Sequence, residues 1–215
     1  MNLKEDKKIP KATAKRLPLY YRYVLALHEE GITRFSSSDL SKTVHVDSAT
    51  IRRDFSYFGE LGKRGYGYDV EKLLDFFTRL LKEDRLMNVA VIGVGNLGSA
   101  LLKFSFQKTR NIRISCAFDI DNTLVDQLVD GVPIYHMDHL DEQLKRQNIE
   151  IAILAVPTDV AQEVTDKLVK SGIKGILNFT TQHITAKKPV VIQNVDLTTE
   201  LQSLIYFVKV AEDEI

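Results

Sequence analysis

Three glycines form the pattern in this chain whose chemical use is clearest. The stretch VIGVGNLGSA, residues 91–100, carries the spacing G-x-G-x-x-G directly after an apolar run. In a strand–turn–helix unit, the first glycine permits a tight turn, the second lets a pyrophosphate approach the backbone, and the third lets the helix pack on the strand. Free N–H groups at the start of the helix would then face the phosphates. The predicted phosphate-binding turn comprises Gly93, Val94, Gly95, Asn96, Leu97 and Gly98.

A carboxylate follows at the distance that a dinucleotide site requires. Asp119 ends the apolar segment IRISCAFDI and lies 21 residues beyond Gly98. A carboxylate there accepts hydrogen bonds from the adenosine ribose hydroxyls and repels a 2′-phosphate. The next residues, Ile120 and Asp121, supply no arginine. The pattern therefore predicts NAD(H) as the cofactor rather than NADP(H).

Apolar segments alternate with helical ones through residues 83–195. The strands are expected in NVAVIG, IRISCAFDI, GVPIYHM, IEIAILAVP, IKGILNFT and KPVVIQNVD, with a helix capped near Thr158 and ended by Gly172 between the fourth and the fifth. Alternation of this kind predicts a Rossmann-like, doubly wound parallel sheet, an α/β fold. Ligands bind at the carboxyl ends of such strands. Val156, Pro157 and Asn178 occupy such ends and join the predicted cofactor site.

The overall charge of zero conceals an asymmetry between the two parts of the chain. Residues 1–82 hold 16 Lys and Arg against 11 Asp and Glu, whereas residues 83–215 hold 13 against 18. A net charge of +5 on the first part favours a polyanionic partner for that part alone. An excess of five charges is also compatible with chance, so a motif is needed to support this interpretation.

The motif is a winged helix-turn-helix over residues 1–82. A first helix is expected in residues 15–31 with Gly31 as its stop, and a second in residues 39–44 with a serine at 36–38 as its cap. A third begins at Asp47 or Ser48 and buries Ile51, Phe55, Phe58 and Leu61 on one face. The other side of this third helix would meet base edges in the major groove. The expected contacts there are Ser48, Thr50, Arg52 and Arg53.

The segment GKRGYGY, residues 62–68, completes the pattern as a glycine-rich wing. Glycine adds no side-chain bulk, so Lys63, Arg64 and Tyr66 could approach the DNA backbone or minor groove. The alternative interpretation is a solvated helix with ordinary surface arginines. The wing and the charge asymmetry together favour DNA binding.

The last segment, residues 196–215, predicts an unusually apolar helix. Leu197, Leu201, Leu204, Ile205 and Val208 form one face, and Tyr206 and Phe207 widen it. Such a helix requires cover on more than one side. It either packs on its own sheet or forms a dimer element against a partner.

Catalytic residues are not evident. His136, His139 and His183 are candidate acids, but histidines near strand ends are more often plain surface residues. The pair Tyr68 and Lys72 has the spacing of short-chain dehydrogenases but precedes the glycine turn, and no substrate domain follows the last strand. Cys116 lies within a strand and is interpreted as a small buried hydrophobe. No apolar run approaches the ~20 residues of a membrane span, and the polar N-terminus is not a secretory signal. A cytoplasmic protein without a metal site is expected.

The chain resembles the Rex family of redox-sensing transcriptional repressors over nearly its whole length. The resemblance rests on KIPKATAKRLPLYYR, VDSATIRRDFSYFGELGKRGYGY, IGVGNLGSAL, GIKGILNFT and VDLTTELQSLIYF. It implies a homodimer that binds a palindromic operator and is released by NADH, with the C-terminal helix exchanged between protomers. Arg16 joins the expected DNA contacts, and Phe104 and Asp196 the expected cofactor site. Some family members place Arg at Asn96 and Tyr at Phe104, so this chain departs from the polar network that those groups form.

Two functions follow from the sequence. The first is a DNA-binding repressor that senses the NADH/NAD⁺ ratio, and the second is a small NAD-dependent oxidoreductase with a basic N-terminal extension. Because the two nucleotides differ only at the nicotinamide, discrimination between them is expected near Phe104 and Asp196, while Asp119 and the glycine turn hold both.

Overall fold

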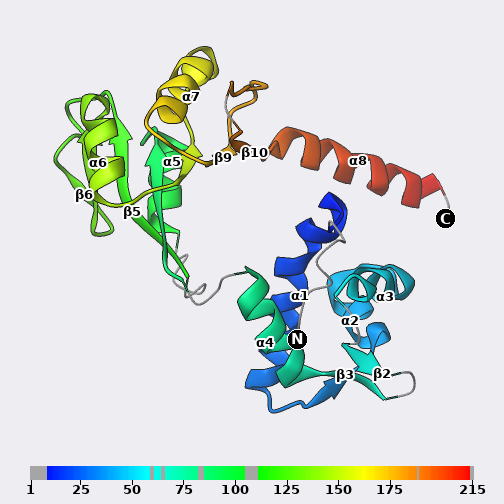
Figure 1. Cartoon of the computed structure of the whole chain (residues 1–215). Helices are drawn as coiled ribbons and strands as arrows, with labels where there is room; N and C mark the ends of the chain where they lie inside the picture. Colours follow the sequence, from blue (N-terminus) through cyan, green and yellow to red (C-terminus); the bar gives the residue numbers. More distant parts are fainter. Residues whose placement is uncertain are drawn as a thin grey trace. The chain divides into compact units, whose positions relative to one another are not determined.

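The computed structural model describes residues 9–58, 61–63, 66–81, 85–104, 111–187 and 189–213. The chain divides into two compact units, Met1–Arg85 and Leu86–Ile215 (Figure 1). The boundary expected after residue 82 falls at residues 82–84, outside the described part.

The described residues of the first unit form four helices. They are α1 (Lys11–Glu29), α2 (Ser37–Val44), α3 (Ser48–Ser56) and α4 (Val70–Leu81). Gly31 ends α1 as expected: its φ is +73°, its N–H donates to the His28 carbonyl, and the Ile32 N–H donates to the Leu27 carbonyl. This pair of bonds is the Schellman arrangement. The helix α4 is absent from the predicted elements.

The caps of α2 and α3 fix the helix-turn-helix. The Ser36 hydroxyl accepts from the Asp39 N–H, and the Asp39 carboxylate accepts from the Ser36 N–H, which is a capping box. Asp47 caps α3 by accepting from Ala49 N–H at 2.7 Å. Between the helices, His45 adopts the left-handed conformation with φ of 52°. The two predicted caps are therefore confirmed.

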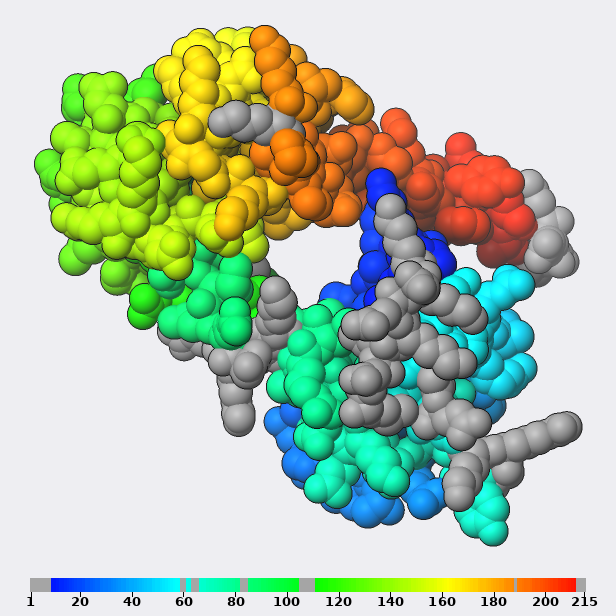
Figure 2. Space-filling model, in the orientation of Figure 1, coloured from blue at the N-terminus to red at the C-terminus, as the bar shows by residue number. Residues whose placement is uncertain are grey.

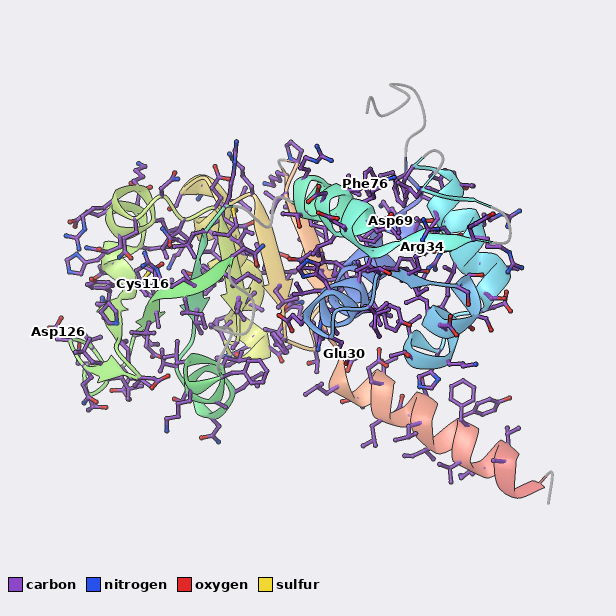
Figure 3. The ribbon with its side chains drawn as sticks, turned by 90° about the horizontal axis from the view of Figure 1, so that it is seen from below. Glu30, Arg34, Asp69, Phe76, Cys116 and Asp126 are labelled. Atoms are coloured by element: carbon purple, nitrogen blue, oxygen red, sulfur yellow. The ribbon has the colours of Figure 1, made fainter. Side chains whose placement is uncertain are left out.

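The wing is part of a three-stranded antiparallel sheet. The strand β3 (Gly67–Asp69) pairs with β2 (Gly62–Lys63) on one side and with β1 (Arg34–Phe35) on the other. The expected hairpin is present. The strand β1 was not predicted, because two residues are too few to show a period. Figure 3 labels Arg34 and Asp69, which are register partners across β1 and β3.

The third helix is shorter than its pattern predicts. It ends at Ser56, so the expectation that Phe58 and Leu61 belong to the helix is wrong. Both side chains are nevertheless buried. Aromatic rings fill the space behind α3: Phe55 packs edge-to-face on Tyr20 at 5.4 Å and on Tyr68 at 4.8 Å between centroids. One core thus joins α1, α3, the wing and α4.

The second unit is a seven-stranded sheet in the order β10-β9-β8-β4-β5-β7-β6. The strands are β4 (Met87–Ile92), β5 (Ile112–Asp119), β6 (Leu128–Val129), β7 (Val132–His136), β8 (Ile151–Leu154), β9 (Gly175–Asn178) and β10 (Val191–Asn194). Six strands are parallel, and the edge strand β6 is antiparallel to β7. This is the doubly wound order with its switch point between β4 and β8.

Helices cover both faces of this sheet because alternate strand residues are apolar on both sides. Val89 and Val91 pack toward α5 (Asn96–Lys103), whereas Ala90 and Ile92 pack toward α6 (Leu140–Arg146) and α7 (Ala161–Lys170). The predicted cap of α7 at Thr158 is wrong. Val160 occupies the cap position of α7, and the Thr158 hydroxyl lies 3.1 Å from that of Thr181. Short 3₁₀ turns precede α6 (Met137–His139) and α7 (Thr158–Val160).

The last helix, α8 (Leu197–Asp213), is exposed on all its described sides. Its exposed large apolar residues are Leu197, Leu201, Leu204, Ile205, Tyr206, Phe207, Val208 and Val210. Figure 2 draws this helix in orange-red to red, towards the C-terminal end of the colour bar. The alternative that α8 packs on its own sheet is therefore not what this chain does by itself.

The left-handed backbone at His45 gives a test of the turn. Replacement His45→Gly removes a conformational cost of about 1–2 kcal/mol and adds an unfolded-state cost of about 0.5–1 kcal/mol. We expect the free energy of unfolding of the first unit to rise by about 0.5 kcal/mol in His45→Gly. His45→Val should lower it, because a β-branched residue is more strongly disfavoured at positive φ than histidine. Urea unfolding followed by circular dichroism measures both.

The matched control is Lys42→Gly, on the exposed surface of α2. Glycine within a helix should lower stability by about 1 kcal/mol. A loss of stability in His45→Gly as large as that in Lys42→Gly would refute the assignment of His45 to a left-handed turn.

Candidate nucleotide site and DNA interface

Backbone contacts enforce the glycine turn between β4 and α5. Gly93 has φ of +89°, and a Cβ there would lie 2.6 Å from the Ala155 carbonyl oxygen. A Cβ on Gly98 would lie only 1.9 Å from the Gly93 carbonyl oxygen, so α5 approaches the turn as closely as backbone permits. A Cβ on Gly95, by contrast, would meet nothing within 4 Å. The first and third glycines are needed by the fold itself, whereas the second faces open space.

The open space over Gly95 is where a pyrophosphate would fit. Gly95 is the N-cap residue of α5 and has no side chain to cap it. The first turn of an α-helix carries N–H groups without intrahelical partners, and its dipole favours an anion. The residues present therefore fit the phosphates of a dinucleotide.

Asp119 ties the turn to the neighbouring strand. Its Oδ2 accepts from the Val94 N–H at 2.6 Å, and its Oδ1 accepts from the N–H groups of Ile120 and Asp121 at 2.7 and 3.0 Å. A carboxylate has about four acceptor positions, so one remains for a ribose hydroxyl. The structure thus brings Asp119 and the glycine turn together, as the sequence predicts.

The neighbouring strand ends contribute differently. Val156 and Pro157 follow β8 beside the switch point, and the Val156 Cγ1 lies near Gly93. Asn178, at the end of β9, is fully buried. Its amide donates to the Asn194 Oδ1 (2.9 Å) and the Gln182 carbonyl (3.1 Å), and its Oδ1 accepts from the N–H and hydroxyl of Thr180. Asn178 is therefore committed to holding the loop at 178–182.

The two residues expected at the nicotinamide lie at helix ends. Phe104 is the C-cap residue of α5 and is 63% exposed. Asp196 caps α8, because its carboxylate accepts from the N–H groups of Thr198 and Thr199 and from the Thr199 hydroxyl. The hydrogen bonds to Thr199 hold the pKa of the Asp196 carboxyl below its ordinary value.

Of the candidate catalytic groups, His136 and His139 have neighbouring partners, Cys116 is buried, and His183 is exposed on the loop after β9. His136 Nδ1 accepts from the Asp138 N–H, and His139 lies 3.7 Å from the Glu142 carboxylate. Cys116 is buried within β5 (Figure 3), and burial raises the pKa of its thiol to about 12. Among the described residues, no group of His, Cys, Asp and Glu is arranged to hold a metal ion.

The outer side of α3 presents two arginines. Arg52 and Arg53 are exposed, and Ser48 and Thr50 are half-buried beside them. Arg52 Nη1 donates to the Ser37 hydroxyl at 3.1 Å, which links α3 to the start of α2. In the wing, Tyr66 is 71% exposed, and its carbonyl accepts from Arg34 Nη1 at 3.3 Å. The side chain of Lys63 and all of Arg64 lie outside the described residues.

The inner side of α3 carries a charge that the sequence reasoning missed. Asp54 is 1% exposed, and three side chains of α1 donate to it. Thr13 Oγ1 and Arg16 Nη2 lie 2.8 Å from its Oδ1, and Arg16 Nε and the Tyr20 hydroxyl lie 2.7 Å from its Oδ2. Arg16, predicted as a DNA contact, has two of its nitrogens bound in this way.

Burial opposes ionisation of Asp54, but the bonds from Arg16, Tyr20 and Thr13 outweigh it and keep the pKa of this carboxyl below its ordinary value. The hydrogen bond to Asp54 raises the pKa of Arg16. The signal available in the sequence was an acidic residue on the apolar face of a helix, between Ile51 and Phe55. Arg34, whose guanidinium donates to the wing at the Tyr66 carbonyl, lies in a two-residue strand and gave no signal in the sequence.

A winged helix-turn-helix and a doubly wound sheet with a phosphate-binding turn define a DNA-binding protein with a sensory domain. Two family models match the two parts: one described as a putative DNA-binding protein N-terminus over residues 8–56, and one described as a CoA binding domain over residues 84–182.

Relatives match nearly the whole chain. The redox-sensing transcriptional repressor Rex 1 of Enterococcus faecalis is 62% identical over 203 residues, 94% of each chain. Rex of Lactobacillus acidophilus is 61% identical over 94% of this chain and 96% of its own. The crystal structure of RSP, a Rex-family repressor, in complex with β-NAD⁺ and operator DNA matches with a TM-score of 0.86 and 33% identity, over 96% of this chain and 95% of that one.

The chain therefore belongs to the Rex family of redox-sensing transcriptional repressors. The comparisons confirm the predicted fold class and the predicted family, and with it the function of a redox-sensing repressor. No helix in the described part of the chain has the length and apolarity to cross a membrane.

The glycine turn predicts opposite outcomes for two similar substitutions. Gly95→Ala adds a methyl group in open space, on a backbone with negative φ, so we expect the melting temperature to stay near that of the wild type. Its affinity for NADH should fall at least about tenfold, or about 1.4 kcal/mol, because the methyl group occupies the pyrophosphate position. Titration of NADH fluorescence measures this.

Gly98→Ala should instead lower the stability of the second unit by about 1–3 kcal/mol, because its Cβ overlaps the Gly93 carbonyl. Thermal unfolding provides the comparison. Unchanged NADH affinity in a folded Gly95→Ala protein would show that the phosphates bind elsewhere.

Proposed function

We propose that this chain is a cytoplasmic, homodimeric repressor that binds a palindromic operator and releases it when NADH binds the second unit. The observation that carries the proposal is the pairing, in one chain, of an exposed arginine face on α3 with open space over Gly95. The family relationship supports it, since the RSP structures include one with β-NADH and one with β-NAD⁺ and operator DNA.

The nucleotide is held mainly by groups that NADH and NAD⁺ share. Gly95 and the start of α5 would hold the pyrophosphate, and Asp119 would accept hydrogen bonds from the ribose hydroxyls. Val94, Asn96, Leu97, Val156 and Pro157 line the same edge, while Asn178 shapes it from behind. Bound NAD(H) supplies the redox signal through its nicotinamide, which we place toward Phe104 and Asp196.

Asn96 and Phe104 give this chain a neutral amide and a ring without a hydroxyl where some family members have Arg and Tyr, so Asp196 is the charged group proposed at the nicotinamide end. A carboxylate attracts the cationic nicotinamide of NAD⁺ but not the neutral ring of NADH, so this end can distinguish the two by charge. NADH can shift the protein only by its differential affinity for the DNA-free arrangement. A tenfold loss of operator affinity needs about 1.4 kcal/mol of coupling.

Operator recognition is assigned to α3 and the wing. Arg53 and Arg52 supply donors for base edges or phosphates, with Ser48 and Thr50 beside them. Lys63, Arg64 and Tyr66 extend the contact through the wing. Arg16 contributes indirectly, through Asp54.

No enzymatic turnover is proposed. His136 and His139 are bound to neighbouring acidic residues, and the thiol of Cys116 is buried and protonated. The nucleotide acts as a signal that is bound and released.

Dimerisation is assigned to α8. Beyond the face that includes Leu201 and Ile205, the helix also exposes Tyr206, Phe207 and Val210, so a partner must cover it on more than one side. Exchange of this helix between two protomers meets that need, and a two-fold protein reads two half-sites about one DNA turn apart.

The central test is a gel shift on the duplex that the wild-type protein selects from a random library, titrated separately with NADH and NAD⁺. NADH should release the DNA at lower concentration than NAD⁺. Arg53→Ala should weaken binding by about 1–3 kcal/mol for a base contact, or reduce the salt slope by about one for a phosphate contact. Its NADH affinity should be unchanged.

Arg79→Ala, which removes an exposed arginine from α4, is the matched control and should bind as the wild type does. If neither nucleotide alters DNA binding, the proposed function fails. Equal losses in Arg53→Ala and Arg79→Ala would remove α3 as the reading helix.

Paired charges on α8 test the dimer. Leu201→Glu with Ile205→Glu places two carboxylates on the apolar face, and sedimentation should show monomers or aggregates without operator binding. Gln202→Glu, one residue away on the polar side, should remain dimeric. A dimeric double variant with full operator affinity would contradict the assignment.

A further inference from the structure

We propose that Asp54 is a positioning residue for DNA recognition: clamped by three side chains of α1, its carboxylate fixes the rotation of α3 and so sets operator specificity. This inference rests on the proposed function, in which α3 reads the operator.

The clamp uses the whole carboxylate. Each oxygen accepts two hydrogen bonds: Oδ1 from Thr13 and Arg16, and Oδ2 from Arg16 and Tyr20, all at 2.7–2.8 Å. These fill the four acceptor positions of a carboxylate. The donors lie on successive turns of α1, so they hold Asp54 along the helix axis as well as across it.

Asp54 is placed where it controls the reading side chains. It neighbours Arg53 in the sequence, and about 100° of helical rotation separates the two side chains. Apolar contacts from Ile51 and Phe55 hold α3 on the core but are non-directional. Hydrogen bonds are directional. A recognition surface must be held to within about 0.5 Å and 10–20°, and the clamp supplies that constraint.

The charge pair is better suited to orientation than to stability. A buried ion pair must overcome the desolvation of both partners, and well-packed apolar residues are often as stabilising. Arg16 is 26% exposed at its side chain, whereas Asp54 is at 2%. Burial, reinforced by Asp54, raises the pKa of Tyr20, so its hydroxyl stays a donor. The arrangement keeps one geometry and excludes rotated ones that leave Asp54 unpaired.

The test compares specificity with affinity. Asp54→Asn keeps the size of the side chain but loses the charge and the symmetric acceptors, and Tyr20→Phe removes one hydrogen bond and keeps the ring. For each variant, affinities are measured at one salt concentration for the duplex selected by the wild type and for a scrambled duplex of equal composition. We expect the ratio of the affinity for the selected duplex to the affinity for the scrambled duplex to fall at least about tenfold in Asp54→Asn and about threefold in Tyr20→Phe. The affinity for NADH should be unchanged in both.

Leu73→Ala is the control. It creates a cavity at a buried position of α4 in the same core, so it lowers stability without touching the bonds to Asp54. It should lower the melting temperature and leave the ratio unchanged at temperatures where it is folded. The inference is overturned if folded Asp54→Asn or Tyr20→Phe keeps the wild-type ratio, or if Leu73→Ala lowers it equally. If Asp54→Asn does not fold, Tyr20→Phe alone decides. A wild-type protein without operator preference would instead overturn the proposed function.

Discussion

The contact between the third glycine and the carbonyl of the first determines how the nucleotide site is built. The space for a Cβ at Gly98 is already filled by the Gly93 carbonyl oxygen. Because the backbone of α5 can come no closer, the start of that helix is set by the strand before it. The same turn is held from the other side by Asp119 through the Val94 N–H. The surface that fits the phosphates therefore exists before any ligand binds. As a result, the turn loses little conformational entropy on binding.

The first unit solves a similar problem by other means. Its third helix is short and packs on a core rich in aromatic rings. Directional bonds from α1 to one buried carboxylate add to that packing, while capping residues at Ser36 and Asp47 set where α2 and α3 begin. In both units, buried or backbone groups hold the surface that is proposed to meet the ligand. The exposed surfaces can then vary with the operator or the nucleotide without changing the frame.

The sequence predicts most of this frame because its signals are local. Glycine spacing, strand alternation and capping residues each constrain a few neighbouring positions, and the turn, six strands and the caps of α2 and α3 follow from them, whereas the cap placed near Thr158 does not. The strands that were missed, β1 and β6, have two residues each, too short to show a period; β1 pairs with the distant β3, whereas β6 pairs with the adjacent β7. The missed helix α4 does carry helical apolar spacing, with Val70, Leu73 and Phe77 buried, so its local signal was overlooked. The early end of α3 has a different origin, since Phe58 and Leu61 are buried by tertiary packing after the helix stops.

The candidate site shows the same division. Asp119 and the glycines are predicted because one motif fixes them, but the partners of Asp54 lie 34 to 41 residues away. Arg16 illustrates the difficulty: its charge suggests a phosphate, and only the fold reveals that its guanidinium is turned to Asp54. The role of Asn178 is hidden in the same way, because three of its four contacts come from the loop residues Thr180 and Gln182, and the fourth comes from the Asn194 side chain at the end of β10.

The buried thiol of Cys116 has a consequence for the kind of redox information this protein can register. It is the single cysteine of the sequence, and a pKa of about 12 leaves almost none of it as thiolate at neutral pH. Peroxides and disulfides react with thiolates, so the Cys116 thiol is a poor site for either. A redox signal carried by a bound nucleotide differs from thiol oxidation in that it ends when the nucleotide dissociates, without a reductase.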